Sequence, residues 1–150
     1  MKSTLIAATA IATLFVAGSA LADQYVDYTP DKGLWHVTSI HVDPNHIDDY
    51  VVGLKLTWVP SHEVLKKRGI IDSYQVMVKL NSGGGDANVL LVEHLTSAST
   101  MDPDKARDMA LDKEISAATP KAASDAKIKE FEKYRTFVSD EYYGSLTYIK

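Results

Sequence analysis

The stretch LWHVTSIHVDPNHIDDY, residues 34 to 50, contains the transition that decides the fold. Its first nine residues are rich in β-branched and aromatic types, which is typical of a β-strand. Asp43 and Pro44 then form a helix start, because aspartate caps free backbone N–H groups and proline is tolerated in the first helical turn. Apolar residues follow at helical spacing as far as Leu65. The stretch therefore predicts a strand over 34–42 that leads into an amphipathic helix.

This helix has a proline in its interior. Pro60 cannot donate a backbone hydrogen bond, and its ring would clash with the carbonyl of Leu56. We therefore expect a kink or a short break there. Gly69 is placed to end the second helical segment, since glycine readily adopts the left-handed conformation that closes helices.

The rest of the chain shows a hairpin, two helices and a final strand. Alternating apolar residues predict two hairpin strands joined by a glycine-rich loop, and Asp-Pro and Thr-Pro pairs mark two helix starts. The glycine run does not predict a phosphate site, because phosphate loops open a helix and this one opens a strand. The predicted elements are strands 70–80 and 88–95, helices 103–118 and 120–138, and a strand over 144–150.

The element order predicts an α+β fold of the ferredoxin-like βαββαβ kind, with an antiparallel four-stranded sheet and an extra helix before the last strand. The first strand has apolar groups on both sides, Leu34 and Ile40 on one and Trp35 and Val37 on the other. When helices cover only one face of a sheet, the other face is exposed to solvent and should be polar. We therefore expect the second face to meet another sheet.

The passage IHVDPNHIDDY (40–50) resembles the strand-to-helix turn of the dimeric α/β-barrel superfamily, and the element order over 34–150 is similar to it as well. Asn45 stands where a glycine is common in that group. The resemblance implies a homodimer in which two ferredoxin-like protomers face their sheets together. The superfamily includes monooxygenases, heme-binding enzymes and members without known activity. Its asparagine-tryptophan-histidine heme-degrading set does not match this chain, so no catalytic residue is carried over.

Residues 1–22 have the layout of a secretory signal peptide: a basic start, an apolar middle and a small-residue ending before cleavage after Ala22. An N-terminal membrane anchor is the weaker reading, since the apolar stretch is shorter than the roughly 20 residues that span a bilayer. We expect a periplasmic or secreted protein with no membrane contact after cleavage. It consists of an N-terminal arm, 23–33, and a single domain, 34–150.

The charge and the cysteine count exclude several classes of function. The chain has 16 basic and 20 acidic residues and no basic cluster, which makes it a poor candidate for nucleic-acid binding. With 0 cysteines it has no thiolate metal site, no thiol catalysis and no c-type heme attachment. The residues themselves predict neither a metal nor a cofactor, and heme is left open by the resemblance alone.

The histidines give the first candidates for chemistry. His36 and His41 point to opposite faces of the predicted strand, so they cannot share a metal, and His46 is an exposed helix-start residue. In a ferredoxin-like sheet the first and third strands are antiparallel neighbours, which would bring His36 near His94 if both share a face. This pair could hold a metal, act as acid and base near neutral pH, or simply satisfy each other and the backbone, and the absence of a third ligand favours the last of these.

A second candidate group lies between the first helix and the sheet. Trp58 and His62 are one helical turn apart and could line a cavity with Tyr74, or could be ordinary core residues. Arg135 falls on the apolar stripe of the third predicted helix, where it could bind a carboxylate or pack its stem while its head reaches water. Glu93 lies on a largely apolar strand, so it should pair with a Lys or Arg across the sheet or, if it is buried unpaired, have a raised pKa.

Three hypotheses for function follow. The first is a secreted homodimer that binds a small, mostly apolar molecule between helices and sheet, through Trp58, His62, Tyr74 and Arg135. The second is an oxidative, monooxygenase-like enzyme, cofactor-free or heme-assisted, that uses His36 with His94 or His62. The third is a structural or partner-binding module without a pocket.

Overall fold

The computed structural model describes residues 22–81 and 86–150. Most of the predicted signal peptide, residues 1–21, lies outside them. So do residues 82–85 of the predicted glycine loop.

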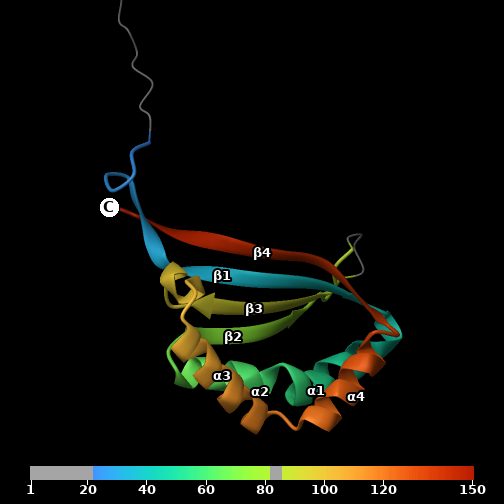
Figure 1. Cartoon of the computed structure of the whole chain (residues 1–150). Coiled ribbons are helices and arrows are strands. Elements are labelled where there is room, and N and C mark those ends of the chain that lie inside the picture. Colours follow the sequence, from blue (N-terminus) through green and yellow to red (C-terminus); the bar gives the residue numbers. More distant parts are fainter. Residues whose placement is uncertain (1–21, 82–85) are drawn as a thin grey trace, which may run out of the picture.

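The described chain forms one sheet with all of its α-helices on one side of it (Figure 1). The elements, in chain order, are β1 (Tyr28–Val42), η1 (Pro44–His46), α1 (Ile47–Thr57), α2 (Val59–Lys67), β2 (Ile71–Val78), β3 (Val89–Leu95), η2 (Ala98–Met101), α3 (Lys105–Ala118), α4 (Lys121–Phe131) and β4 (Arg135–Tyr148). The strand order is β2-β3-β1-β4, and every neighbouring pair is antiparallel. This is the ferredoxin-like topology, and the tandem α3 and α4 provide the extra helix before the last strand.

Local sequence signals explain the first helical region. The Asp43 carboxylate accepts the N–H of Asn45 at 2.9 Å, which starts the helical turn η1 as predicted. The break expected at Pro60 is confirmed: α1 ends at Thr57, and Pro60 lies in the first turn of α2. Gly69 has a φ of 69° and ends α2, with its N–H donating to the carbonyl of Lys66.

Two strands are longer than predicted, and the third predicted helix is shorter. β1 begins at Tyr28 inside the expected arm, where it pairs with Tyr148 of β4. The helix predicted to reach Val138 ends at Phe131, and β4 begins at Arg135. The prediction was wrong here because Phe131, Tyr134 and Val138 match helical spacing by coincidence, while the sequence RTFVSDEYY is rich in strand-forming residues.

The start of α3 also differs from the prediction. Asp104, rather than Asp102, caps the helix, and its carboxylate accepts the N–H groups of Ala106 and Arg107 at 3.0 Å each. Asp102 instead ends the short helix η2. The proline between the two aspartates is compatible with either reading, so the sequence alone could not separate them.

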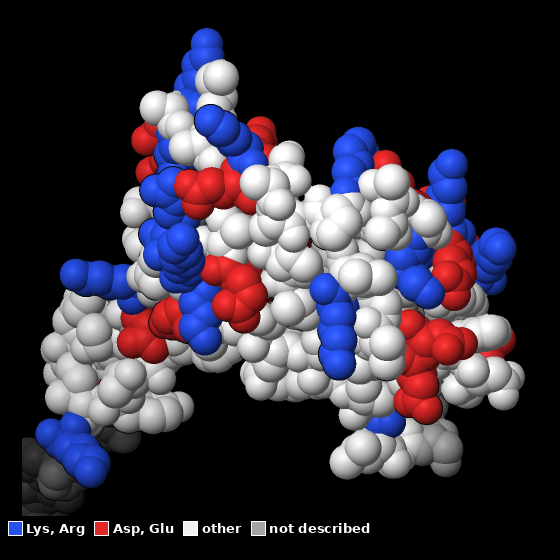
Figure 2. Space-filling view, turned by 90° about the horizontal axis from the view of Figure 1, so that it is seen from below, with Lys and Arg blue, Asp and Glu red and all other residues white. Residues whose placement is uncertain are grey.

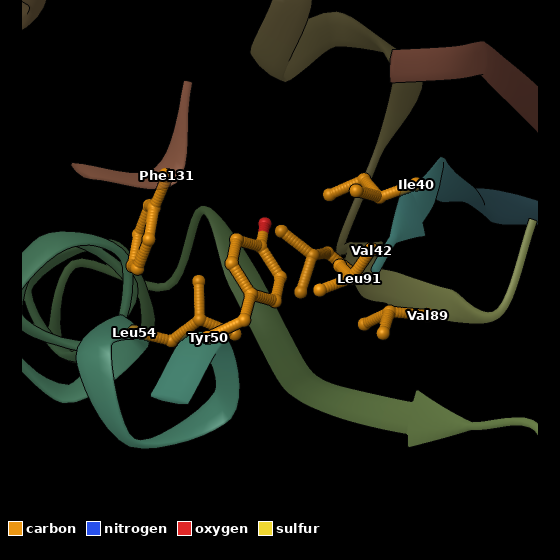
Figure 3. Close-up of a cluster of buried hydrophobic side chains, with 7 residues drawn as sticks. All are labelled: Ile40, Val42, Tyr50, Leu54, Val89, Leu91 and Phe131. Carbon is orange, nitrogen blue, oxygen red and sulfur yellow. The ribbon is translucent and has the colours of Figure 1, made fainter. Parts of the chain in front are cut away.

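The core lies between the helices and the sheet. Tyr50 of α1 is completely buried, with Phe131 on one side and Ile40, Val42 and Leu91 on the other (Figure 3). The Tyr50 and Phe131 rings pack edge to face, 4.6 Å between centroids. This contact fixes α1 against the end of α4.

The opposite face of the sheet has no helix on it (Figure 1). Trp35, Leu90 and Met77 belong to this face. The neighbours of Leu90 and Met77 along their strands point into the core, and Trp35 lies an odd number of residues from the core residue Ile40. Met77 is 42% exposed. The predicted second apolar face is therefore present.

Lys and Arg side chains lie among Asp and Glu side chains at both ends of the helical layer, with a mostly uncharged surface between them (Figure 2). Among the described residues, no helix combines the length and the apolar character needed to cross a membrane.

Candidate functional site

One row of residues crosses the helix-facing side of all four strands. The strand register pairs Tyr74 with Glu93, Glu93 with His36, and His36 with Tyr142. His36 stacks on the Tyr142 ring, with 4.4 Å between centroids and 10° between planes. A polar row thus interrupts the apolar face of the sheet where α2 lies over it.

His94 does not belong to this row, so the expected pairing of His36 with His94 is wrong. The register places His94 opposite Trp35, on the face without helices. There its Nδ1 donates to the Asp72 carboxylate at 2.8 Å, and its ring packs against Trp35. Adjacent strands align residues by register, and the sequence does not give that register.

The partner of His36 is Glu93. Asp140 contacts the other nitrogen of His36, and His62 lies beside the other oxygen of Glu93, so the four side chains form one network. His36 donates through Nδ1 to Glu93 and through Nε2 to Asp140, at 2.8 Å each. The other Glu93 oxygen lies 2.5 Å from His62 Nε2, an ion-pair distance without hydrogen-bond geometry. His62 Nδ1 donates to the Trp58 carbonyl at 2.8 Å, and this bond holds the His62 ring at the start of α2.

The acids and imidazoles of this network stabilise one another's charged forms. Burial alone would lower the pKa of His36, but the hydrogen bonds to Glu93 and Asp140 outweigh it, and the pKa rises above its ordinary value. Burial likewise acts to raise the pKa of Glu93, yet His62 and His36 hold that pKa below its usual range. Of the two alternatives expected for Glu93, pairing is the one observed, but with two imidazoles rather than with Lys or Arg, so the raised pKa of an unpaired carboxyl does not arise.

Three of the predicted ligand-binding residues form one aromatic group. The Trp58 and His62 rings lie 3.7 Å apart, and Tyr74 is 5.3 Å from Trp58 and 5.5 Å from His62 between centroids. The Tyr74 hydroxyl donates to Glu63, and this bond raises the pKa of Tyr74 to about 12. Trp58, between α1 and α2, and His62, one helical turn further on, both contact this group from the helical layer.

Trp58 also lines a pocket of about 230 Å³ between helices α1 and α4 and strands β1, β3 and β4. It is lined by Thr38, Tyr50, Leu54, Thr57, Trp58, Leu91, Ile128, Arg135 and Phe137. Its walls are mostly apolar, with a few polar groups, as in many small-molecule sites. The structure thus brings Trp58 and Arg135 into one pocket, although Arg135 reaches it from a strand rather than from a helix.

Arg135 lies in an aromatic surround. Its guanidinium carbon is 5.0 Å from the centroid of Phe131, 4.8 Å from that of Phe137 and 5.7 Å from that of Tyr50. Its Nη1 donates to the Tyr50 hydroxyl at 3.4 Å. Within the described residues Arg135 has no carboxylate partner. A cation without an anion therefore lines a mostly apolar pocket.

Asp140 and Tyr142 are site residues that the sequence did not indicate. A β-bulge at Val138 shifts the pairing of β4, so Phe137 and Asp140 reach the same face despite their odd spacing. Thr38 joins Asp140 to the pocket, since its hydroxyl donates to the Asp140 carboxylate at 2.8 Å. In the described part of the chain, no group of three or more acidic, histidine or cysteine residues is arranged to hold a metal.

No protein-family model and no curated protein matches the sequence. Solved structures with a similar chain path include a dimeric ferredoxin-like protein of unknown function from Bacteroides fragilis, at 11% identity over 81% of this chain and 100% of that one, with a TM-score of 0.40. A dimeric ferredoxin-like protein of unknown function from Thermobifida fusca is 9% identical over 79% and 92%, with a TM-score of 0.37. A possible oxidoreductase from Bacteroides thetaiotaomicron is 11% identical over 79% and 99%, with a TM-score of 0.37. No residue role is taken from these proteins.

Proposed function

We propose that this protein binds a small, mainly apolar molecule with an anionic group in the pocket between Trp58 and Arg135. The observation that carries the proposal is Arg135 itself, a cation on the pocket wall without a carboxylate partner in the described residues. A guanidinium in apolar surroundings strongly favours the binding of an anion that can accept two parallel N–H bonds from it. The apolar walls would hold the body of the ligand.

Calorimetry with two matched probes tests this proposal. 2-Naphthoate and 2-naphthylmethanol share an aromatic body, and only the first is charged. We expect the naphthoate to bind about ten- to a hundredfold more tightly, because a hydrogen bond to a charged group contributes about 1.5–3 kcal/mol. The Arg135→Gln variant should remove this difference, while Arg107→Gln, on helix α3, should preserve it. Equal affinities for the two probes would contradict the proposal.

We also propose that the chain works as a homodimer formed through the face of the sheet without helices. The apolar residues Trp35, Leu90 and Met77 on this face support the proposal, since exposed apolar patches on a sheet are commonly covered by a partner. Export to the periplasm or the medium is proposed from residues 1–22, and a mature protein that begins at Asp23 would support it.

A second candidate function is an enzyme that transfers protons. It is favoured by Glu93, a largely buried carboxylate held between two imidazoles, since an acid and two bases in contact are a combination that proton-transfer enzymes use. Both ring nitrogens of His36 and of His62 already have partners, which favours a cofactor-free enzyme over a heme-assisted one. Titration with hemin tests this preference: a saturable Soret shift that His62→Ala removes would favour heme.

A further inference from the structure

The proposed pocket has two polar ends of opposite hydrogen-bonding character. At one end Arg135 can only donate hydrogen bonds. Tyr50 is beside it, and its hydroxyl oxygen accepts from Arg135. The hydroxyl proton of Tyr50 has no acceptor among the described residues, so it is a second donor at this end. An anion here would meet two donors.

The other end of the pocket is an acceptor. The Thr38 hydroxyl has one proton, and it donates that proton to Asp140 Oδ1 at 2.8 Å. The same carboxylate oxygen accepts from His36 Nε2 at 2.8 Å, so the imidazole and the carboxylate hold each other in their charged forms. Only the lone pairs of the Thr38 oxygen are therefore left for a ligand, and a ligand group at this end must be a donor.

The two ends are well separated along β1. Arg135 pairs with Val42, four residues from Thr38, which corresponds to about 13 Å between backbone positions at about 3.3 Å per residue. Phe137 pairs with Ile40 and so lies between the two ends. Leu54, Leu91 and Ile128 complete the apolar lining. The Arg135 guanidinium extends over the Phe137 ring, 4.8 Å from its centroid, so a ligand that reaches both ends is shorter than this backbone separation. It must still be elongated, and apolar in its middle.

We infer that the pocket takes an elongated hydroxy acid: an apolar body with a carboxylate at Arg135 and a hydroxyl that donates to Thr38. This inference rests on the proposed anion-binding function and adds to it the second polar group and its donor character. The carboxylate provides most of the affinity. The hydroxyl selects among acids of similar size, because a buried acceptor left without a donor is unfavourable.

Three naphthoates test the hydroxyl end. Calorimetry compares 2-naphthoate, 6-hydroxy-2-naphthoate and 6-methoxy-2-naphthoate, of which only the hydroxy acid can donate at its far end. We expect the hydroxy acid to bind about three- to tenfold more tightly than the methoxy acid, as one neutral hydrogen bond allows. Thr38→Val should remove this preference, and Thr38→Ser, which keeps the hydroxyl, should retain it.

Thr57→Val is the matched control, since Thr57 also lines the pocket and its hydroxyl donates to the Gly53 carbonyl at 3.3 Å. The preference should survive this substitution. A methoxy acid that binds as tightly as the hydroxy acid to the native protein would overturn the inference, and so would a preference that disappears in Thr57→Val and persists in Thr38→Val. The native protein alone gives the first result, so the test does not depend on a variant that folds.

The same titrations separate this inference from the proposed function. If 2-naphthoate binds through Arg135 and the hydroxyl adds nothing, the hydroxy-acid inference fails and the anion pocket stands. If 2-naphthoate binds no better than 2-naphthylmethanol, the anion pocket fails, and the inference fails with it.

Discussion

Glu93 is the residue on which the polar row depends. It accepts from His36 in β1 and lies at ion-pair distance from His62 in α2, so it joins the helical layer to the sheet. A largely buried carboxylate is tolerated only when it is paired, and removal of its partners leaves an uncompensated charge. The chain keeps this arrangement at a position where an apolar residue would fit the strand, which points to function.

The pKa of His36 reports directly on this pairing. In Glu93→Gln the pKa of His36 should fall, because the variant removes a negative charge and an acceptor of the imidazolium. Titration of the His36 ring protons by NMR measures the shift. Glu63→Gln, which removes the partner of Tyr74 instead, should leave the His36 titration in place. An unchanged pKa in Glu93→Gln would show that the two groups are not paired in solution.

Stability should depend on pH through the same two residues. The folded state raises the pKa of His36, so its contribution is complete below the unfolded value of about 6.5 and is lost as pH rises through the folded pKa. The folded state lowers the pKa of Glu93, so its contribution is present above about 4.3 and is lost as pH falls through the folded pKa. The stabilisation should therefore be greatest between these limits.

Urea unfolding at pH 6 and pH 8.5 tests the upper limit. The native protein should lose more unfolding free energy between the two conditions than His36→Gln does. His46→Gln, which removes a half-buried imidazole outside the polar row, should behave like the native protein. An identical loss in native protein and His36→Gln would contradict the account.

At the scale of the elements, the sequence was sufficient where a single residue type determines the backbone. The start at Asp43, the break at Pro60 and the end at Gly69 all follow from local chemistry. Pairing between strands was not predictable in this way. The register that aligns His36 with Glu93 and the bulge at Val138 depend on contacts between distant segments.

The candidate site was predicted in part for the same reason. Helical spacing was enough to place Trp58 beside His62, and strand alternation was enough to put Tyr74 on the face below them. Arg135 was recognised as an unusual cation but was assigned to the wrong element, because an accidental helical stripe continued past Phe131. Whether these residues bind a ligand stays a prediction.

The contact of α1 with α4 makes Gly53 intolerant of a side chain. A Cβ at Gly53 would lie 2.6 Å from two carbon atoms of the Phe131 ring. Gly53→Ala should therefore destabilise the protein by about 1 kcal/mol, because overpacking costs about 1–3 kcal/mol and outweighs the roughly 1 kcal/mol that alanine adds to a helix. Gly144→Ala, where the space is open, should have little effect. Urea unfolding of both variants measures the difference, and a stabilised Gly53→Ala would contradict the packing.

For the whole molecule, the proposed dimer makes the face of the sheet without helices the surface to test. A lysine at Met77 would place a charge in the proposed dimer interface, so Met77→Lys should sediment as a monomer at tens of micromolar while the native protein sediments as a dimer. Val52→Lys, on the exposed side of α1, should remain dimeric. A native protein that is monomeric at this concentration would contradict the proposed dimer.

The Trp58 indole can report on whether an apolar anion occupies the proposed pocket. The chain has 2 tryptophans, so in Trp35→Phe the indole N–H signal in a ¹H–¹⁵N NMR spectrum belongs to Trp58 alone. Addition of 2-naphthoate should shift this signal saturably, since Trp58 lines the pocket and a bound aromatic ring changes its surroundings. The shift should vanish when Arg135→Gln is added to Trp35→Phe. A Trp58 signal that does not move with 2-naphthoate, or that moves equally in both proteins, would contradict the account.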